Sequence, residues 1–130
     1  MLRQDFDRRV GNVGVTRSQW MMIVVAARQP GATQRQIADI LDMSEASAGR
    51  LIDRLCADGM IERKPRDDDR RAHSVSITDK AKPILEQIGE IARDSAGRVF
   101  SNFSDEELSQ FSTLLDKLYD NLGGSNPVLR

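Results

Sequence analysis

Apolar residues recur every three to four positions along most of the chain, with charged residues between them, a spacing typical of amphipathic helices. Three helix starts are marked by a capping box, in which a Ser or Thr caps the helix and a Gln or Glu three residues later bonds back to it. These boxes are Thr16–Gln19, Thr33–Gln36 and Ser104–Glu107. Ser44 and Thr78 predict two further helix starts, each with a cap but no box.

One stretch breaks the helical period. Residues 60–64 and 74–78 show short strand-like patterns on either side of a charged, turn-rich segment, which predicts a two-stranded hairpin. Just before it, the short turn Asp42-Met43 separates two predicted helices and requires a steep angle between them, as in a helix-turn-helix. The sequence therefore predicts a mainly α fold of the α+β class, a winged helix-turn-helix with a two-stranded β wing and terminal dimerisation helices.

The helices outside this lobe are predicted to form a dimer. The segment Ala81–Val99 carries more apolar surface than one small lobe can cover, and the first and last helices are amphipathic too. Packing these helices around a two-fold axis would bury their apolar stripes. We expect a DNA-binding lobe at residues 16–78, a helical dimerisation region at 1–15 and 79–122, and a flexible tail at 123–130.

Composition excludes several classes of protein. The chain has 130 residues, of which 39% are hydrophobic and 30% charged, and its longest apolar run, Trp20–Ala27, is far shorter than the roughly 20 residues of a membrane span. The charged N-terminus is unlike a signal peptide, which predicts a cytoplasmic protein. One cysteine and one histidine exclude a disulfide framework and a soft-ligand metal cage. No phosphate loop or nucleophile motif is present, so we expect no enzyme, no cofactor and no metal.

The charge is distributed unevenly along the chain. Residues 1–78 carry 13 basic and 11 acidic side chains, a net charge of +2, whereas residues 79–122 carry 5 and 9, a net charge of −4. Any surface that binds an anion is therefore expected in the first 78 residues.

The helix predicted after Ser44 has an apolar side and an outer side. The apolar side carries Ala48, Leu51, Ile52 and Leu55. The outer side carries Ala46, Ser47, Arg50, Asp53 and Arg54. An arginine there can bond guanine in the major groove, and the free N–H groups of residues 44–47 favour a phosphate. The alternative is a solvated helix whose arginines pair with Asp53 and Asp58.

The hairpin tip carries mixed charge. Its basic residues are Arg63, Lys64, Arg66, Arg70 and Arg71, and the segment from Glu62 to His73 also carries four acidic residues. Such a tip could insert an arginine into a narrow minor groove, with a neighbouring aspartate bracing the guanidinium. The alternative is a surface loop that neutralises its own charge.

Five segments in this order resemble the MarR family of bacterial transcriptional regulators: Thr16–Trp20, Thr33–Leu41, Arg50–Leu55, Gly59–Arg63 and Asp68–Arg71. The resemblance covers roughly residues 2–122. It implies a homodimer with intertwined terminal helices and a winged helix-turn-helix in each subunit. It also implies a repressor that binds a palindromic operator in double-stranded DNA and is released by a small phenolic or aromatic carboxylate effector, or by oxidation.

The resemblance assigns roles to single residues. Ser47 and Arg50 match contact positions of the recognition helix, Arg71 matches the wing-tip arginine, and Asp69 matches the acid that orients it. The candidate DNA-binding residues are thus Ser44, Ala46, Ser47, Arg50, Arg54, Asp69, Arg70 and Arg71.

Three further residues bear on ligand binding, on thiol reactivity and on the number of DNA contacts. Trp20 is the candidate ligand residue, although a tryptophan before an apolar run is more often part of the core. Cys56 has no cationic neighbour in sequence and is expected to be an inert, partly buried thiol. Gly49 stands where many relatives have Thr or Ser, so one DNA contact of the family is expected to be missing.

A second function belongs to a different class. Winged helices also serve as protein-interaction modules without DNA binding, and the segment Thr33–Ile61 has three basic and five acidic residues, a net charge of −2. Duplex binding that weakens steeply with salt would distinguish a regulator from such a module.

Overall fold

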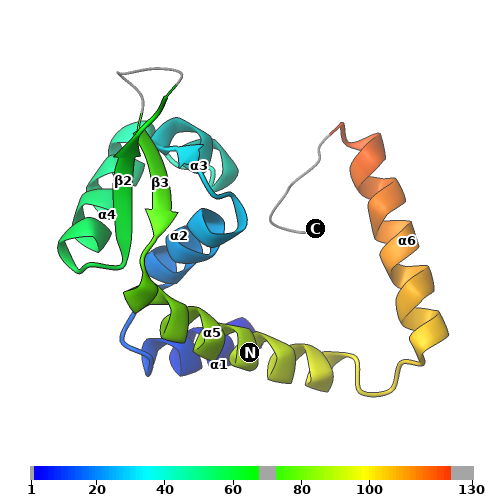
Figure 1. Cartoon of the computed structure of the whole chain (residues 1–130). Helices are drawn as coiled ribbons and strands as arrows, with labels where there is room; N and C mark the ends of the chain where they lie inside the picture. Colours follow the sequence, from blue (N-terminus) through cyan, green and yellow to red (C-terminus); the bar gives the residue numbers. More distant parts are fainter. Residues whose placement is uncertain (1, 68–72, 124–130) are drawn as a thin grey trace.

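A computed structural model describes residues 2–67 and 73–123 of the chain (Figure 1). Its elements follow in the order α1 Leu2–Gly11, α2 Arg17–Arg28, β1 Ala32–Thr33, α3 Gln34–Ile40, α4 Glu45–Ala57, β2 Ile61–Pro65, β3 His73–Ile77, a 3-10 turn Asp79–Ala81, α5 Lys82–Val99 and α6 Asp105–Asn121. The predicted winged helix-turn-helix within a mainly helical chain is confirmed.

The three capping boxes form as the sequence predicts. At the start of α2, the Thr16 side chain accepts from the Gln19 N–H at 3.3 Å, and the Gln19 side chain accepts from the Thr16 N–H at 2.8 Å. Both bonds are also present at the starts of α3 and α6. Ser44 caps α4 by accepting from the Ser47 N–H at 3.1 Å. These bonds satisfy N–H groups that have no partner within the helix.

The prediction that Thr78 caps the fifth helix is wrong. Its side chain makes no capping bond and instead donates to the carbonyl oxygens of Gly59 at 2.5 Å and Met60 at 3.2 Å. The chain then forms the 3-10 turn, and α5 begins only at Lys82. Pro83 therefore lies in the first turn of α5, where its missing N–H breaks no helical bond.

The sheet has three antiparallel strands in the order β1-β3-β2. The predicted hairpin is confirmed, with Ile61 opposite Ile77 and Pro65 opposite His73. The third strand, β1, was not predicted; it pairs Ala32 with Val75. Two residues are too short to show a strand period.

The core lies between α2, α3, α4 and the sheet. Its largest fully buried side chains include Met22, Ile37, Ile52, Leu55 and Val75. Below this lobe, α1 packs along α5, as Figure 1 shows. Buried Val10 on α1 and Ile88 on α5 belong to the same core cluster, so the two helices are fixed to the lobe by apolar contact.

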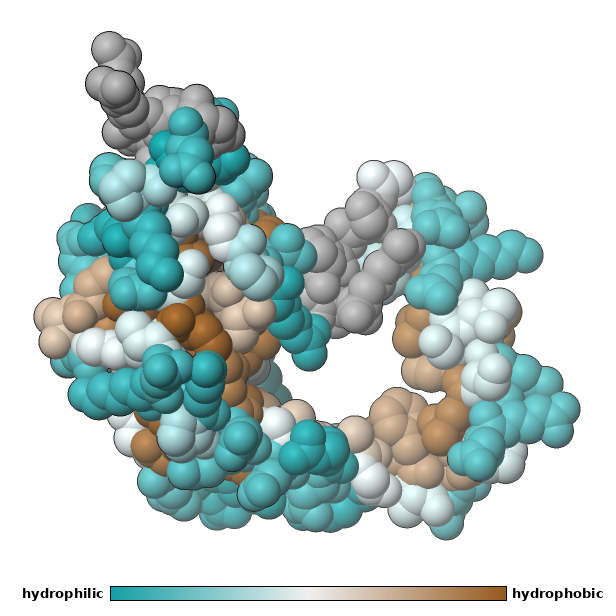
Figure 2. Space-filling model, viewed as in Figure 1, coloured by the Kyte–Doolittle hydropathy of each residue, from teal (hydrophilic) through white to brown (hydrophobic). Residues whose placement is uncertain are grey.

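The last helix, α6, stands away from the lobe (Figure 1), and none of its residues is buried. Hydrophobic surface gathers along α6 and at the α5–α6 corner, on the side that faces the hollow between α6 and the lobe (Figure 2). The exposed large apolar residues of this region are Val99, Phe103, Phe111, Leu114, Leu115, Leu118 and Leu122. No helix among residues 2–67 and 73–123 is long and apolar enough to cross a membrane.

Candidate nucleic-acid interface

The turn between α3 and α4 sets the angle of the second helix. Leu41 ends α3, and Asp42 takes a positive φ of 52°, a left-handed conformation that aspartate tolerates better than most residues. The Met43 N–H then bonds the carbonyl oxygen of Ala38 at 3.0 Å, and Ser44 begins α4. The turn occurs where the sequence predicts it, and it turns α4 so that one side packs on the core.

That packed side of α4 leaves the opposite side to solvent. Ala48, Ile52 and Leu55 are 0%, 0% and 1% exposed, as the apolar period predicts. Four candidate residues of this helix lie on the other side, and Ser44 caps its N-terminus. Ser44, Ala46, Arg50 and Arg54 are exposed and Ser47 is half-buried.

Hydrogen bonds organise the N-terminal end of this surface. The Ser44 hydroxyl donates to the Ser47 hydroxyl at 2.9 Å, and an Arg50 Nη2–H group donates to the same Ser47 oxygen at 3.3 Å. The Arg50 guanidinium keeps further N–H groups that can bond a base or a phosphate.

The alternative in which the α4 arginines pair with acidic neighbours does not match the geometry. Asp53 forms its ion pair with Arg63 of β2, at 2.6 Å between Oδ1 and Nη1. Among the described residues, neither Arg50 nor Arg54 forms an ion pair with Asp53 or Asp58. The positive charges of Arg50 and Arg54 are therefore not neutralised by Asp53 or Asp58, and both guanidinium groups can bind an anionic ligand.

The wing rises beside α4 as strands β2 and β3 (Figure 1). Its candidate residues Asp69, Arg70 and Arg71 lie outside the described residues. On β2, Lys64 pairs with Glu62 at 3.0 Å. The ion pair between Arg63 and Asp53 joins this strand to α4.

Sequence reasoning missed one set of contacts on this surface. The Gln34 side chain, at the start of α3, donates to the Glu45 carbonyl oxygen at 3.3 Å and accepts from Arg63 Nη2 at 3.3 Å. Gln34 appeared in the sequence only as part of a capping box. The one signal was Gly49, because a glycine inside a helix leaves space for a neighbouring side chain.

The profile of the MarR family matches residues 13–72, which include the helix-turn-helix and much of the wing. The transcriptional regulator PA3341 is 27% identical in sequence and superposes with a TM-score of 0.81, over 94% of this chain and 90% of its own. The chain belongs to the MarR family.

Other members of the MarR family have the same fold. A MarR protein from Peptoclostridium difficile DA00132 is 25% identical, with a TM-score of 0.74 over 89% of this chain and 76% of its own. A MarR mutant from E. coli, solved in complex with operator DNA, is 24% identical, with a TM-score of 0.69 over 91% of this chain and 88% of its own. At 24% identity, this second likeness shows a shared fold.

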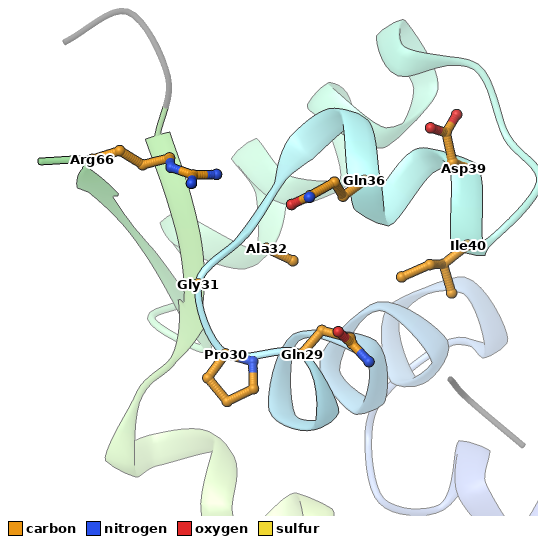
Figure 3. Close-up of a pocket in the computed structure, with 8 residues that line it drawn as sticks. All are labelled: Gln29, Pro30, Gly31, Ala32, Gln36, Asp39, Ile40 and Arg66. Carbon is orange, nitrogen blue, oxygen red and sulfur yellow. The ribbon is translucent and has the colours of Figure 1, made fainter. Parts of the chain in front are cut away.

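The described part of this MarR-family chain includes two polar cavities. The first, of about 430 Å³, lies between the α2–β1 loop, α3 and the start of the wing loop; Figure 3 shows Arg66 on its wing side and Gln36 and Asp39 on α3. The second, of about 440 Å³, lies between the α1–α2 loop, the end of α4 and the 3-10 turn before α5, next to Gln19 and Lys80. Both have polar walls, so a ligand of either would need polar groups.

Trp20, the candidate ligand residue, lines neither cavity. Its ring packs against the core and meets the ring of Phe6 edge-on, with 5.4 Å between centroids. Its indole Nε1–H is buried and has no hydrogen-bond partner among the described residues. A buried donor without a partner carries a desolvation cost, so an acceptor that reached it would bind favourably.

Cys56 fits the expectation of an unreactive thiol. It is half-buried on α4, and burial raises the pKa of its thiol above the ordinary value; the Arg63 charge opposes this shift and the Asp53 charge adds to it. The thiolate is the reactive form, so a raised pKa lowers reactivity at neutral pH.

Proposed function

We propose that this MarR-family protein is a DNA-binding transcriptional regulator that binds a palindromic operator as a homodimer. The observation that carries the proposal is the outer face of α4. It presents Arg50 and Arg54, without acidic partners among the described residues, on the side of the helix away from the core. We propose binding rather than catalysis as the activity, in keeping with the family.

In the proposed complex, α4 lies in the major groove. Arg50 is at the centre of its outer face and would donate to guanine O6 and N7. Ser44 and Ser47 lie at the helix N-terminus, where backbone N–H groups and the helix dipole favour a phosphate. Arg71 and Arg70 of the wing tip would follow the minor groove, with Asp69 orienting Arg71.

The proposed dimer uses the apolar face of α6. A single chain rarely leaves so much contiguous apolar surface in water. A second copy of the chain would cover this face by packing its own α6 and the neighbouring helices against it. Two copies of α4 would then reach successive major grooves, with half-sites about 10 bp apart from centre to centre.

We also propose that the protein is a repressor released by a small aromatic or phenolic acid. The buried Nε1–H group of Trp20 is a donor that a carboxylate or phenolate could bond, provided the surrounding side chains move. Such an effector would act by favouring a separation of the two α4 helices that does not fit DNA.

Selection of bound sequences from a random duplex pool, repeated with phenolic and aromatic acids present, tests this function. On the selected operator, Arg50→Ala is expected to weaken binding by about 1–3 kcal/mol and to relax the preference at one base per half-site. Arg93→Ala is the matched control, because Arg93 is an exposed arginine of α5 and its loss changes the charge equally. Equal binding by both variants would contradict the assignment of α4.

The second candidate function is a protein-interaction module. The net charge of −2 over residues 33–61 favours it, because phosphate repels a negative surface. A wild-type protein that binds no duplex even at low salt would support this function and refute the regulator.

A further inference from the structure

One line of residues on α4 faces the wing and the start of α3. Glu45, Gly49 and Asp53 follow one another at four-residue spacing, which places them above one another on the helix. The neighbouring elements contact this line at both ends. Gln34 donates to the carbonyl oxygen of Glu45, and Arg63 pairs with the carboxylate of Asp53.

The middle of this line is open because residue 49 is glycine. A Cβ atom at Gly49 would lie 2.8 Å from Gln34 Nε2 and 3.4 Å from Gln34 Cδ, so the amide occupies the space of a side chain. Glycine inside a helix is less stable than alanine. The glycine, however, allows the Gln34 amide to lie directly against α4.

Arg63 connects this amide to the wing. Its Nη2 donates to Gln34 Oε1 at 3.3 Å, and its Nη1 pairs with Asp53 at 2.6 Å. Since the guanidinium is a planar fork, two partners on two different helices fix its orientation. β2 is thereby tied at one point to both α3 and α4.

We infer that Gln34, Arg63 and Asp53 form a brace that fixes the wing relative to the recognition helix, and that Gly49 is a positioning residue for DNA binding because it admits the brace. This inference rests on the proposed function. Two groups that must enter different grooves of one duplex bind best when their relative position is fixed before binding.

Gly49→Ala tests the brace because stability and DNA binding should change in opposite directions. The added methyl displaces the end of the flexible Gln34 side chain, and Arg63 loses one of its two partners. Affinity for the selected operator is expected to fall about two- to tenfold. The melting temperature is expected to rise by about 3–5 °C, because alanine favours the helix. A glycine needed only for folding would lower both.

A double-mutant cycle that combines Gly49→Ala with Gln34→Ala isolates the contact between residue 49 and the Gln34 amide. Without the Gln34 amide there is nothing to displace, so Gly49→Ala should raise the melting temperature and leave operator affinity unchanged. Gly97→Ala is the matched control, since a Cβ on this glycine of α5 would meet no other atom within 4 Å. It should stabilise the protein and leave DNA affinity unchanged, with the dimer verified by light scattering.

The outcomes separate the brace from the proposed function. If wild-type protein binds the operator and Gly49→Ala binds it equally well, the brace has no role in recognition and only this inference fails. Additive effects of Gln34→Ala and Gly49→Ala on affinity would overturn it as well. If wild-type protein binds no duplex, the proposed function fails and the role of the brace in DNA binding fails with it.

Discussion

Dimerisation is expected to depend on the apolar face of α6, and replacing Leu114 and Leu118 together by alanine tests this dependence. In the single chain their side chains are 64% and 53% exposed. The substitutions therefore remove little from the fold of one protomer, whereas they remove the centre of the surface proposed to meet the partner.

The expected magnitude follows from these exposed fractions. Full burial of a leucine side chain contributes about 1.5–3 kcal/mol, so burying the exposed part of both leucines contributes about 2–3.5 kcal/mol per protomer. A two-fold interface contains the set twice, about 3.5–7 kcal/mol in all. The Kd of the dimer should therefore rise by about two to five powers of ten, nearer the lower figure because alanine keeps one methyl group.

Sedimentation across a dilution series measures this Kd, with circular dichroism to verify that the helices remain. Thr113→Ala is the control, since Thr113 lies on the other side of α6, where its hydroxyl donates to the Ser109 carbonyl oxygen at 3.0 Å. A double leucine variant that dimerises as tightly as wild type would refute the use of this face.

Two further predictions concern charge. Arg71→Ala should weaken binding to operator and unrelated DNA alike and reduce the salt dependence by about two counterions per dimer, as measured in a salt titration; an unchanged slope would exclude a phosphate contact at the tip. Hydrogen bonds from Arg8 and then Arg98 hold the pKa of Asp5 below its ordinary 3.8. The stability that they contribute is present above pH 3.8 and lost as the pH falls through the lower folded value. Asp5→Asn should therefore make acid unfolding, followed by circular dichroism, less steep in that range; an identical acid transition would contradict this role.

Much of the fold could be predicted because its signals are local. A capping box at Thr16 or Ser104 depends on residues three positions apart and needs no partner from a distant part of the chain. The outer face of α4 was predicted for the same reason, since the period of Ala48, Ile52 and Leu55 decides which side is buried.

The features that could not be predicted depend on partners far along the chain. β1 exists because Ala32 meets Val75, 43 positions later. Threonine is a residue type that often caps helices, but the Thr78 hydroxyl donates instead to the carbonyl oxygens of Gly59 and Met60. The contact of Gln34 with Arg63 spans 29 positions, and neither residue type by itself predicts this hydrogen bond.

The hydrogen bonds of Thr78 also connect the winged helix-turn-helix lobe to α5. Its bonds to Gly59 and Met60, together with the Lys80 Nζ bond to the Asp58 carbonyl oxygen at 2.7 Å, join the end of α4 to the turn before α5. The helix proposed to read DNA is therefore attached at its C-terminal end to the helix that leads towards the proposed dimer interface. The second cavity touches both sides of this junction, through Asp58 and Lys80. We expect a change in the angle between the two α5 helices to move both α4 helices as rigid bodies, because hydrogen bonds to backbone atoms leave the junction little freedom to bend.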